Sequence, residues 1–214
     1  MTVLRLLLLG AIGTSLALAE ENKVTYEPLS EEAKAVSLLA MAAYEKGDLA
    51  EARLQFEKMR AVSSGHPMAM INLGTIEFRT GRFEQSAAWL EKAVQADPKS
   101  ADAWMLLGMV RVHQDLPDLA LAALAQAQVL APKNPKIHNY LGVAIGRKRW
   151  FDGAESELQL AISLDPEYGD AHFNLALILL QRDPPNLALA RRHYQTAIKL
   201  GAVPDPSMEK KLAP

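Results

Sequence analysis

The chain has 214 residues, of which 50% are hydrophobic and 6% aromatic, and it contains no cysteine. This composition excludes a disordered chain, a disulfide-stapled fold and any site that depends on a thiolate. The net charge of −2 at pH 7 gives no electrostatic reason to expect a nucleic-acid partner.

The first 19 residues have the pattern of an export signal. Arg5 precedes an apolar run that extends to Leu16, and Ala17-Leu18-Ala19 forms a cleavage site of the small-x-small type. We therefore expect residues 1–19 to be a signal peptide and the protein to be exported, with the bacterial periplasm as the first expectation. Secretion, or anchoring in the membrane by an uncleaved signal, is the alternative.

A short linker, residues 20–32, is expected to lead into the first helix. Ser30 followed by Glu31 and Glu32 is typical of a capped helix start, because the serine side chain can accept a backbone hydrogen bond and the acids lie at the positive end of the helix dipole.

A period of 34 residues then runs through the chain. The units are 33–66, 67–100, 101–134, 135–168 and 169–204, the last with two extra residues. Position 7 is leucine in every unit, and position 8 is always alanine or glycine. The position 7 residues are Leu39, Leu73, Leu107, Leu141 and Leu175. Apolar and small residues recur at helical spacing, so each unit is predicted to be two packed helices.

Turn residues fall between the predicted helices. Gly47 and Gly81 are suited to the left-handed position after a first helix, and Asp115-Leu116-Pro117 takes the same place in the third unit. Asp97-Pro98, like its counterparts in the next two units, is expected to end a second helix. Residues 205–214 form a short tail that is too short for a full capping helix, so an apolar face is expected at this end.

The third and fourth units carry the residues of a known repeat. These residues are Trp104, Leu107, Gly108, Ala120, Leu124, Ala127 and Pro132, then Leu141, Gly142, Ala154, Leu158, Ala161 and Pro166. In this respect the chain resembles the tetratricopeptide repeat family over residues 33–204. The resemblance implies an all-α fold, a right-handed α-solenoid of five helix-turn-helix units, which presents a concave face to a protein partner.

Positions 5, 9 and 12 of the first helices, with 2 and 13 beside them, are left to face that groove, and the resemblance implies the same assignment. The residues predicted to line it are Met41, Tyr44, Ile71, Thr75, Phe78, Arg79, Met105, Met109, Val112, Asn139, Val143, Arg147, Phe173 and Leu177. This mostly apolar set favours a bound peptide or amphipathic helix over a clamp for a C-terminal carboxylate. The alternative is that several of these residues are buried against neighbouring helices. Replacing Phe78 and Met109 by glutamate should then abolish partner capture without unfolding.

Other candidate residues have simpler interpretations. His138 and His172 share position 4 with Trp104 and are expected to be packing residues rather than metal ligands, and His113 is expected to be solvated. Glu77 and Arg111 share position 11 in adjacent units, so they form either an ion pair or two independent solvated charges.

The sequence favours a protein-interaction scaffold that acts in assembly of a cell-envelope complex. No catalytic residues, cofactor, metal or small-molecule substrate are expected, because no nucleophile and base, phosphate loop or paired acids stand out. The alternative function is a self-associating structural protein, with a homodimer as its simplest form.

Overall fold

The computed structural model describes residues 29–63 and 66–213, and every regular element within them is an α-helix. The helices are α1 (Glu31–Glu45), α2 (Leu49–Val62), α3 (Pro67–Arg79), α4 (Phe83–Ala96), α5 (Ala101–His113), α6 (Pro117–Leu130), α7 (Pro135–Arg147), α8 (Phe151–Leu164), α9 (Gly169–Gln181), α10 (Leu187–Lys199) and α11 (Pro206–Leu212). The all-α expectation is confirmed. The predicted signal peptide, residues 1–19, lies outside the described residues.

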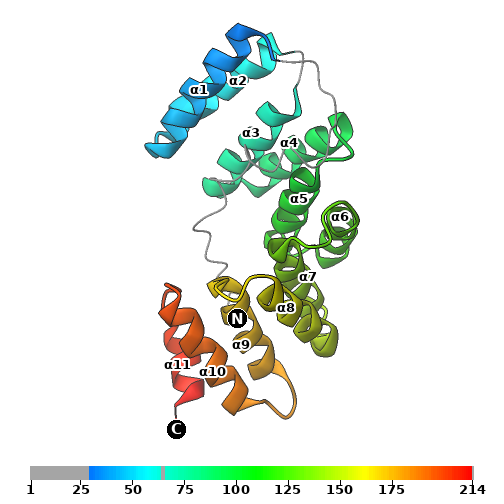
Figure 1. The fold of residues 1–214 in the computed structure, drawn as a ribbon, viewed down its shortest axis with the longest axis vertical. Coiled ribbons are helices and arrows are strands. Elements are labelled where there is room, and N and C mark those ends of the chain that lie inside the picture. Colours follow the sequence, from blue (N-terminus) through cyan, green and yellow to red (C-terminus); the bar gives the residue numbers. More distant parts are fainter. Residues whose placement is uncertain (1–28, 64–65, 214) are drawn as a thin grey trace. The chain divides into compact units, whose positions relative to one another are not determined.

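The helices belong to two compact units, residues 20–130 and residues 131–214. We call them the N-terminal unit, with α1 to α6, and the C-terminal unit, with α7 to α11. Within each unit the helices pack in successive pairs, α1 with α2, α3 with α4, and so on to α9 with α10 (Figure 1). Each pair falls within one of the 34-residue periods of the sequence.

Local sequence explains where the helices begin and end. The Ser30 hydroxyl accepts a hydrogen bond of 3.1 Å from the Ala33 N–H, as its position before two acids predicts. Ser100 caps α5 in the same way, at 3.2 Å from the Ala103 N–H. At the other ends, α4, α6 and α8 each stop two residues before a proline, which cannot continue the helical hydrogen bonds.

The turn inside four of the pairs uses one residue in the left-handed region. At position 15, φ is +79° for Gly47, +75° for Gly81, +58° for Asp115 and +63° for Arg149. The predicted role of the two glycines is therefore confirmed, and the fold imposes the same conformation on an aspartate and an arginine. The conformation is set by the turn and tolerated by the residue.

Gly81→Ala is expected to lower the free energy of unfolding by about 1 kcal/mol. An added Cβ meets no atom within 4 Å at this position, so the cost is the backbone strain of an L-residue at positive φ. Gly81→Asn should cost less, because asparagine visits this region more readily. Urea denaturation of the two variants measures the difference, and equal costs would contradict a strain that depends on residue type.

The leucines at position 7 form the core between successive pairs, except at the first. Leu73, Leu107, Leu141 and Leu175 are at most 6% exposed, whereas Leu39 is 60% exposed. The prediction that all five are packing residues is wrong for Leu39. On the later first helices this row lies against the preceding second helix, and no described helix precedes α1.

The C-terminal end differs from the expected apolar face. Residues 206–212 form α11, which packs beside α10 with Met208 and Leu212 buried (Figure 1). The Tyr194 hydroxyl accepts a 2.7 Å hydrogen bond from the Asp205 N–H, and the Arg191 Nε donates one of 2.8 Å to the Leu212 carbonyl. Two buried side chains and these polar contacts let a seven-residue helix cover the end of the array.

Glu77 and Arg111 do not pair with each other, so the hypothesis of an ion pair between them is wrong. The buried Glu77 carboxylate lies 3.1 Å from the Arg53 Nε and also contacts Arg82. Arg111 pairs instead with Glu91. Position 11 therefore points toward the second helix of the preceding pair, and not toward position 11 of its neighbour.

Candidate functional site

The fourteen residues predicted to line the groove differ widely in exposure. Nine are buried, namely Tyr44, Phe78, Met105, Met109, Val112, Asn139, Val143, Phe173 and Leu177. Three are partly exposed, namely Met41, Ile71 and Thr75, and two are exposed, namely Arg79 and Arg147. The accessible part of the predicted surface is thus smaller and more polar than the sequence pattern indicates.

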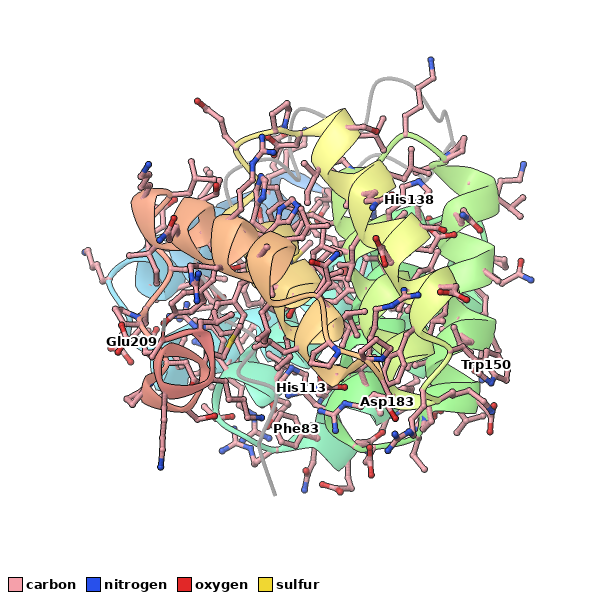
Figure 2. The ribbon with its side chains drawn as sticks, turned by 90° about the horizontal axis from the view of Figure 1, so that it is seen from below. Phe83, His113, His138, Trp150, Asp183 and Glu209 are labelled. Carbon is pink, nitrogen blue, oxygen red and sulfur yellow. The ribbon has the colours of Figure 1, made fainter. Side chains whose placement is uncertain are left out.

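Contacts between neighbouring first helices cover much of this row in the N-terminal unit. The Phe78 and His113 rings meet edge to face with centroids 4.8 Å apart, and Phe83 stacks on His113 at 5.4 Å. Figure 2 shows Phe83 and His113 next to each other, at the ends of α4 and α5 that face the turns. His113 is therefore part of an aromatic cluster and not a solvated side chain.

Tyr44 and Arg79 form a second contact between α1 and α3. The Arg79 guanidinium lies over the Tyr44 ring, 4.7 Å from its centroid, which is the geometry of a cation–π interaction. Burial raises the pKa of Tyr44, so the hydroxyl keeps its proton at neutral pH and stays a hydrogen-bond donor.

This burial contradicts one expectation from the sequence. Phe78 is 7% exposed and Met109 is 1% exposed, so glutamate at either position would place a carboxylate among packed side chains. Such variants would lose partner capture through unfolding. A test of the groove has to use the partly exposed residues Met41 and Ile71 instead.

In the C-terminal unit, Asn139 belongs to a buried polar chain. Its amide donates to the Tyr168 hydroxyl at 3.3 Å, and the Asn174 amide donates to the Asn139 Oδ1 at 2.9 Å. Asn139 is fully buried and Asn174 is 3% exposed. The asparagine predicted to face a ligand thus connects α7 with α9.

Burial dominates the ionisation of the groups around this chain. It raises the pKa of Asp170 to about 6, with the Lys136 ammonium acting in the opposite direction. Burial also raises the pKa of the Tyr140 and Tyr168 phenols. The tyrosines therefore stay protonated and act as hydrogen-bonding groups at neutral pH.

Position 4 has a role that sequence reasoning only partly found. The Trp104 Nε1 donates to the Pro98 carbonyl at 3.0 Å, and the Nε2 atoms of His138 and His172 lie 2.8 and 3.2 Å from the carbonyls of Pro132 and Pro166. Burial confirms the two histidines as packing residues. The signal for the added hydrogen bond is a ring N–H six residues after the proline that ends a repeat.

A hollow outside the predicted groove also escaped sequence reasoning. It measures about 380 Å³ and lies in the N-terminal unit, between α4, α5 and α6. Trp104, Leu107 and Leu119 give it apolar walls, and the Glu91 and Arg111 ion pair lies at its side. Leu119 is 51% exposed, which is the only property that marks it in the structure, and no sequence signal distinguishes it.

Two further searches cover only the part of the chain that the structure describes. In it, no three histidine, cysteine, aspartate or glutamate side chains gather in a way that could hold a metal ion. No helix in these same residues has the length and apolarity that crossing a membrane requires.

Comparison with known proteins identifies the repeat. The sequence model described as the tetratricopeptide repeat matches residues 37–101, 71–135 and 146–206, which together make up well over half of the chain. The matches overlap and follow the 34-residue spacing, because each one spans two adjacent helix pairs.

A curated relative and two solved structures give the same result. The type IV pilus assembly protein PilF of Pseudomonas aeruginosa is 31% identical over 134 residues, which are 62% of this chain and 52% of that protein. The chain therefore spans about half the length of this relative.

The two structures are similar in fold at lower identity. The structure of Pseudomonas aeruginosa PilF has a TM-score of 0.73 at 17% identity, with 86% of this chain and 83% of that one covered. MamA of Desulfovibrio magneticus has a TM-score of 0.69 at 20% identity, with 81% and 97% covered. These likenesses confirm the fold class, a solenoid of helix pairs.

Proposed function

The chain belongs to the tetratricopeptide repeat family, and from this premise we propose that it is a non-catalytic scaffold that binds a segment of a partner protein. Stacked helix pairs bury one continuous core and leave a long surface on which a partner can lie. The observation that carries the proposal is a set of accessible side chains at groove positions of α1 and α3. Met41, Ile71 and Thr75 are partly exposed there, and Arg79 is exposed.

The chemistry of this surface supports an apolar or amphipathic segment as the ligand. Met41 and Ile71 offer aliphatic contact area, and the flexible methionine adapts to different side chains. Thr75 uses its hydroxyl to donate to the Ile71 carbonyl at 2.9 Å, so it presents mainly its methyl group. A helix that lays its apolar face on such a surface is a common mode of peptide recognition.

We place this function in assembly of a complex of the bacterial cell envelope. The signal-peptide pattern of residues 1–19 supports export, and the relative PilF carries the name of a pilus assembly protein. N-terminal sequencing of the protein from a periplasmic fraction is expected to begin at Glu20. A chain that starts at Met1 and is recovered from the cytosol would contradict this location.

The double variant Met41→Glu with Ile71→Glu is expected to lose partner capture while keeping its fold. Both side chains are partly exposed, so the new carboxylates stay solvated in the free protein, but they would be desolvated under a bound apolar segment. The measurement is affinity purification from an extract of the native host with quantitative mass spectrometry, and circular dichroism verifies the fold.

The matched control is Leu54→Glu on α2. Leu54 is 46% exposed and lies outside the predicted groove, so this variant adds a carboxylate to the same unit at a comparable exposure. It should capture the same partner as the wild type. If the double variant captures as much of that partner as Leu54→Glu does, the partner does not bind at α1 and α3.

One observation favours a second candidate function, pairing of two copies. Leu38 and Leu39 on α1 are 71% and 60% exposed, whereas α11 covers the opposite end of the array. A head-to-head arrangement about a twofold axis would bury both leucines of both copies, and it needs only one surface. It predicts a closed dimer and no filaments.

Analytical ultracentrifugation tests the pairing. If it occurs, the wild type sediments as a dimer and Leu38→Glu with Leu39→Glu as a monomer. Val203→Glu, at a 46% exposed site near α11, should leave the dimer intact. A wild-type chain that stays monomeric at high concentration would exclude this function.

A further inference from the structure

The Tyr44 side chain is buried on α1, at 5% exposure, and its hydroxyl has no hydrogen-bond partner within the described parts of the chain. A buried hydroxyl without a partner is costly, since it gave up its hydrogen bonds to water on folding. Other buried polar groups of the same unit avoid this cost. The Glu77 carboxylate, for example, meets both Arg53 and Arg82.

The neighbour of this hydroxyl is a cation. Arg79 comes from the last turn of α3, is exposed, and lies flat over the Tyr44 ring. Stacking uses the face of the guanidinium and leaves the N–H groups along its edge directed sideways. No ion pair of Arg79 with an acid is found in residues 29–63 or 66–213, although Glu45 follows Tyr44 on α1.

These two groups together define the chemistry of a ligand. The protonated hydroxyl supplies one donor, and the guanidinium edge supplies two more in a fixed plane. A carboxylate has four acceptor positions and forms paired hydrogen bonds with a guanidinium, so it would satisfy both groups at once. An amide or hydroxyl ligand would leave the charge of Arg79 without a counterion.

We propose that Tyr44 and Arg79 form an anion-recognition point that takes one carboxylate of the bound partner segment. The inference rests on the proposed function, because the carboxylate is that of a segment lying over Met41, Ile71 and Thr75. It adds that the segment carries an acidic group next to its apolar face. The acidic group fixes the position of the segment along the surface, and the apolar contacts supply contact area.

Nuclear magnetic resonance with small mimics tests the site in the full chain. The probes are N-acetyl-glutamate methylamide for a side-chain carboxylate, N-acetyl-alanine for a C-terminal carboxylate, and N-acetyl-glutamine methylamide as the uncharged control. We expect a carboxylate probe to shift the Arg79 Nε–H and Tyr44 ring signals in a saturable manner. The probe with the higher affinity identifies the source of the carboxylate. Equal responses to the charged and uncharged glutamate mimics would overturn the proposal.

Variants separate recognition from structure. Tyr44→Phe keeps the ring and should weaken the charged probe about tenfold, the effect of one hydrogen bond to a charged group. Arg79→Gln should abolish saturable binding. Arg147→Gln changes the arginine at the same repeat position of the fourth unit, where the preceding unit has Val112 in place of a tyrosine, and should have no effect. Unchanged binding in both Tyr44→Phe and Arg79→Gln would also overturn the proposal.

The outcome is independent of partner capture. If capture depends on Met41 and Ile71 but no carboxylate probe binds, the anion site is rejected and the scaffold function stands. If a probe binds through Tyr44 and Arg79 but capture ignores Met41 and Ile71, the anion site stands and the proposed function fails.

Discussion

Replacing Met109 by glutamate is expected to abolish cooperative folding of the helices around it. Met109 is 1% exposed on α5, so the new carboxylate would be buried without a partner. Burial of an unpaired charge belongs to the most destabilising class of substitutions, and we expect a loss of about 4 kcal/mol or more. Because a domain of this size has only about 5–15 kcal/mol of stability, this is a large share of the total. Urea denaturation followed by circular dichroism measures it.

The matched control is Met41→Glu, which changes the same residue type at the same repeat position. Met41 is partly exposed on α1, so its carboxylate keeps most of its hydration, and the expected change is within about 1 kcal/mol. The comparison isolates burial from repeat position. Equal midpoints for the two variants would show that Met109 is open to solvent, and the wide apolar groove expected from the sequence would then be correct.

Gly108→Ala is expected to lower the free energy of unfolding by about 2 kcal/mol. An alanine Cβ at this position would lie 2.5 Å from the Leu124 Cγ and 3.3 Å from the Ala120 carbonyl oxygen. The clash involves the branch point of a buried leucine, which cannot turn away as the end of a flexible side chain could, so α5 and α6 must separate. Thermal and urea unfolding measure the loss.

Leu124→Phe is expected to restore much of the stability that Gly108→Ala removes. Position 8 is glycine where position 24 is leucine, as in Gly74 with Leu90, and it is alanine where position 24 is aromatic. The aromatic pairs are Ala40 with Phe56 and Ala176 with Tyr194. A flat ring has no branched carbon at Cγ, so it leaves room for a Cβ on the facing helix.

A double-mutant cycle tests this pairing. We expect a favourable coupling of about 1 kcal/mol or more between the two substitutions, because each one changes the shape that the other meets. Free energy changes that simply add would mean that the glycine is required for another reason. The single variant Leu124→Phe supplies the remaining corner of the cycle, and its extra volume should be destabilising on its own.

The accessible surface is where sequence reasoning went furthest from the structure. Position 12 is Tyr44, Phe78 and Val112 in the first three units, and an apolar row on a first helix is compatible with either a ligand or a neighbouring helix. The contact of Phe78 with His113 decides for the neighbour. Sequence periodicity identifies a face of a helix but not what covers that face.

The polar residues show the same limit. Asn139 reads as a ligand-facing side chain from its repeat position, but it hydrogen-bonds with Tyr168 and Asn174, which are 29 and 35 residues away. Glu77 was paired with the wrong arginine, because partners across a helix packing depend on side-chain direction and not on repeat position alone.

The sequence by itself determined the helix pairs, their period, the left-handed turn residues and the small residues at position 8, because these follow from local hydrogen bonding and from spacing along one helix. Only the tertiary structure decided which residues stay exposed. Leu39 is open because α1 has no described helix before it, Met109 is buried, and α11 covers the far end. Exposure depends on what packs against a residue, and neither end effects nor contacts between successive first helices are encoded in the pattern of a single repeat.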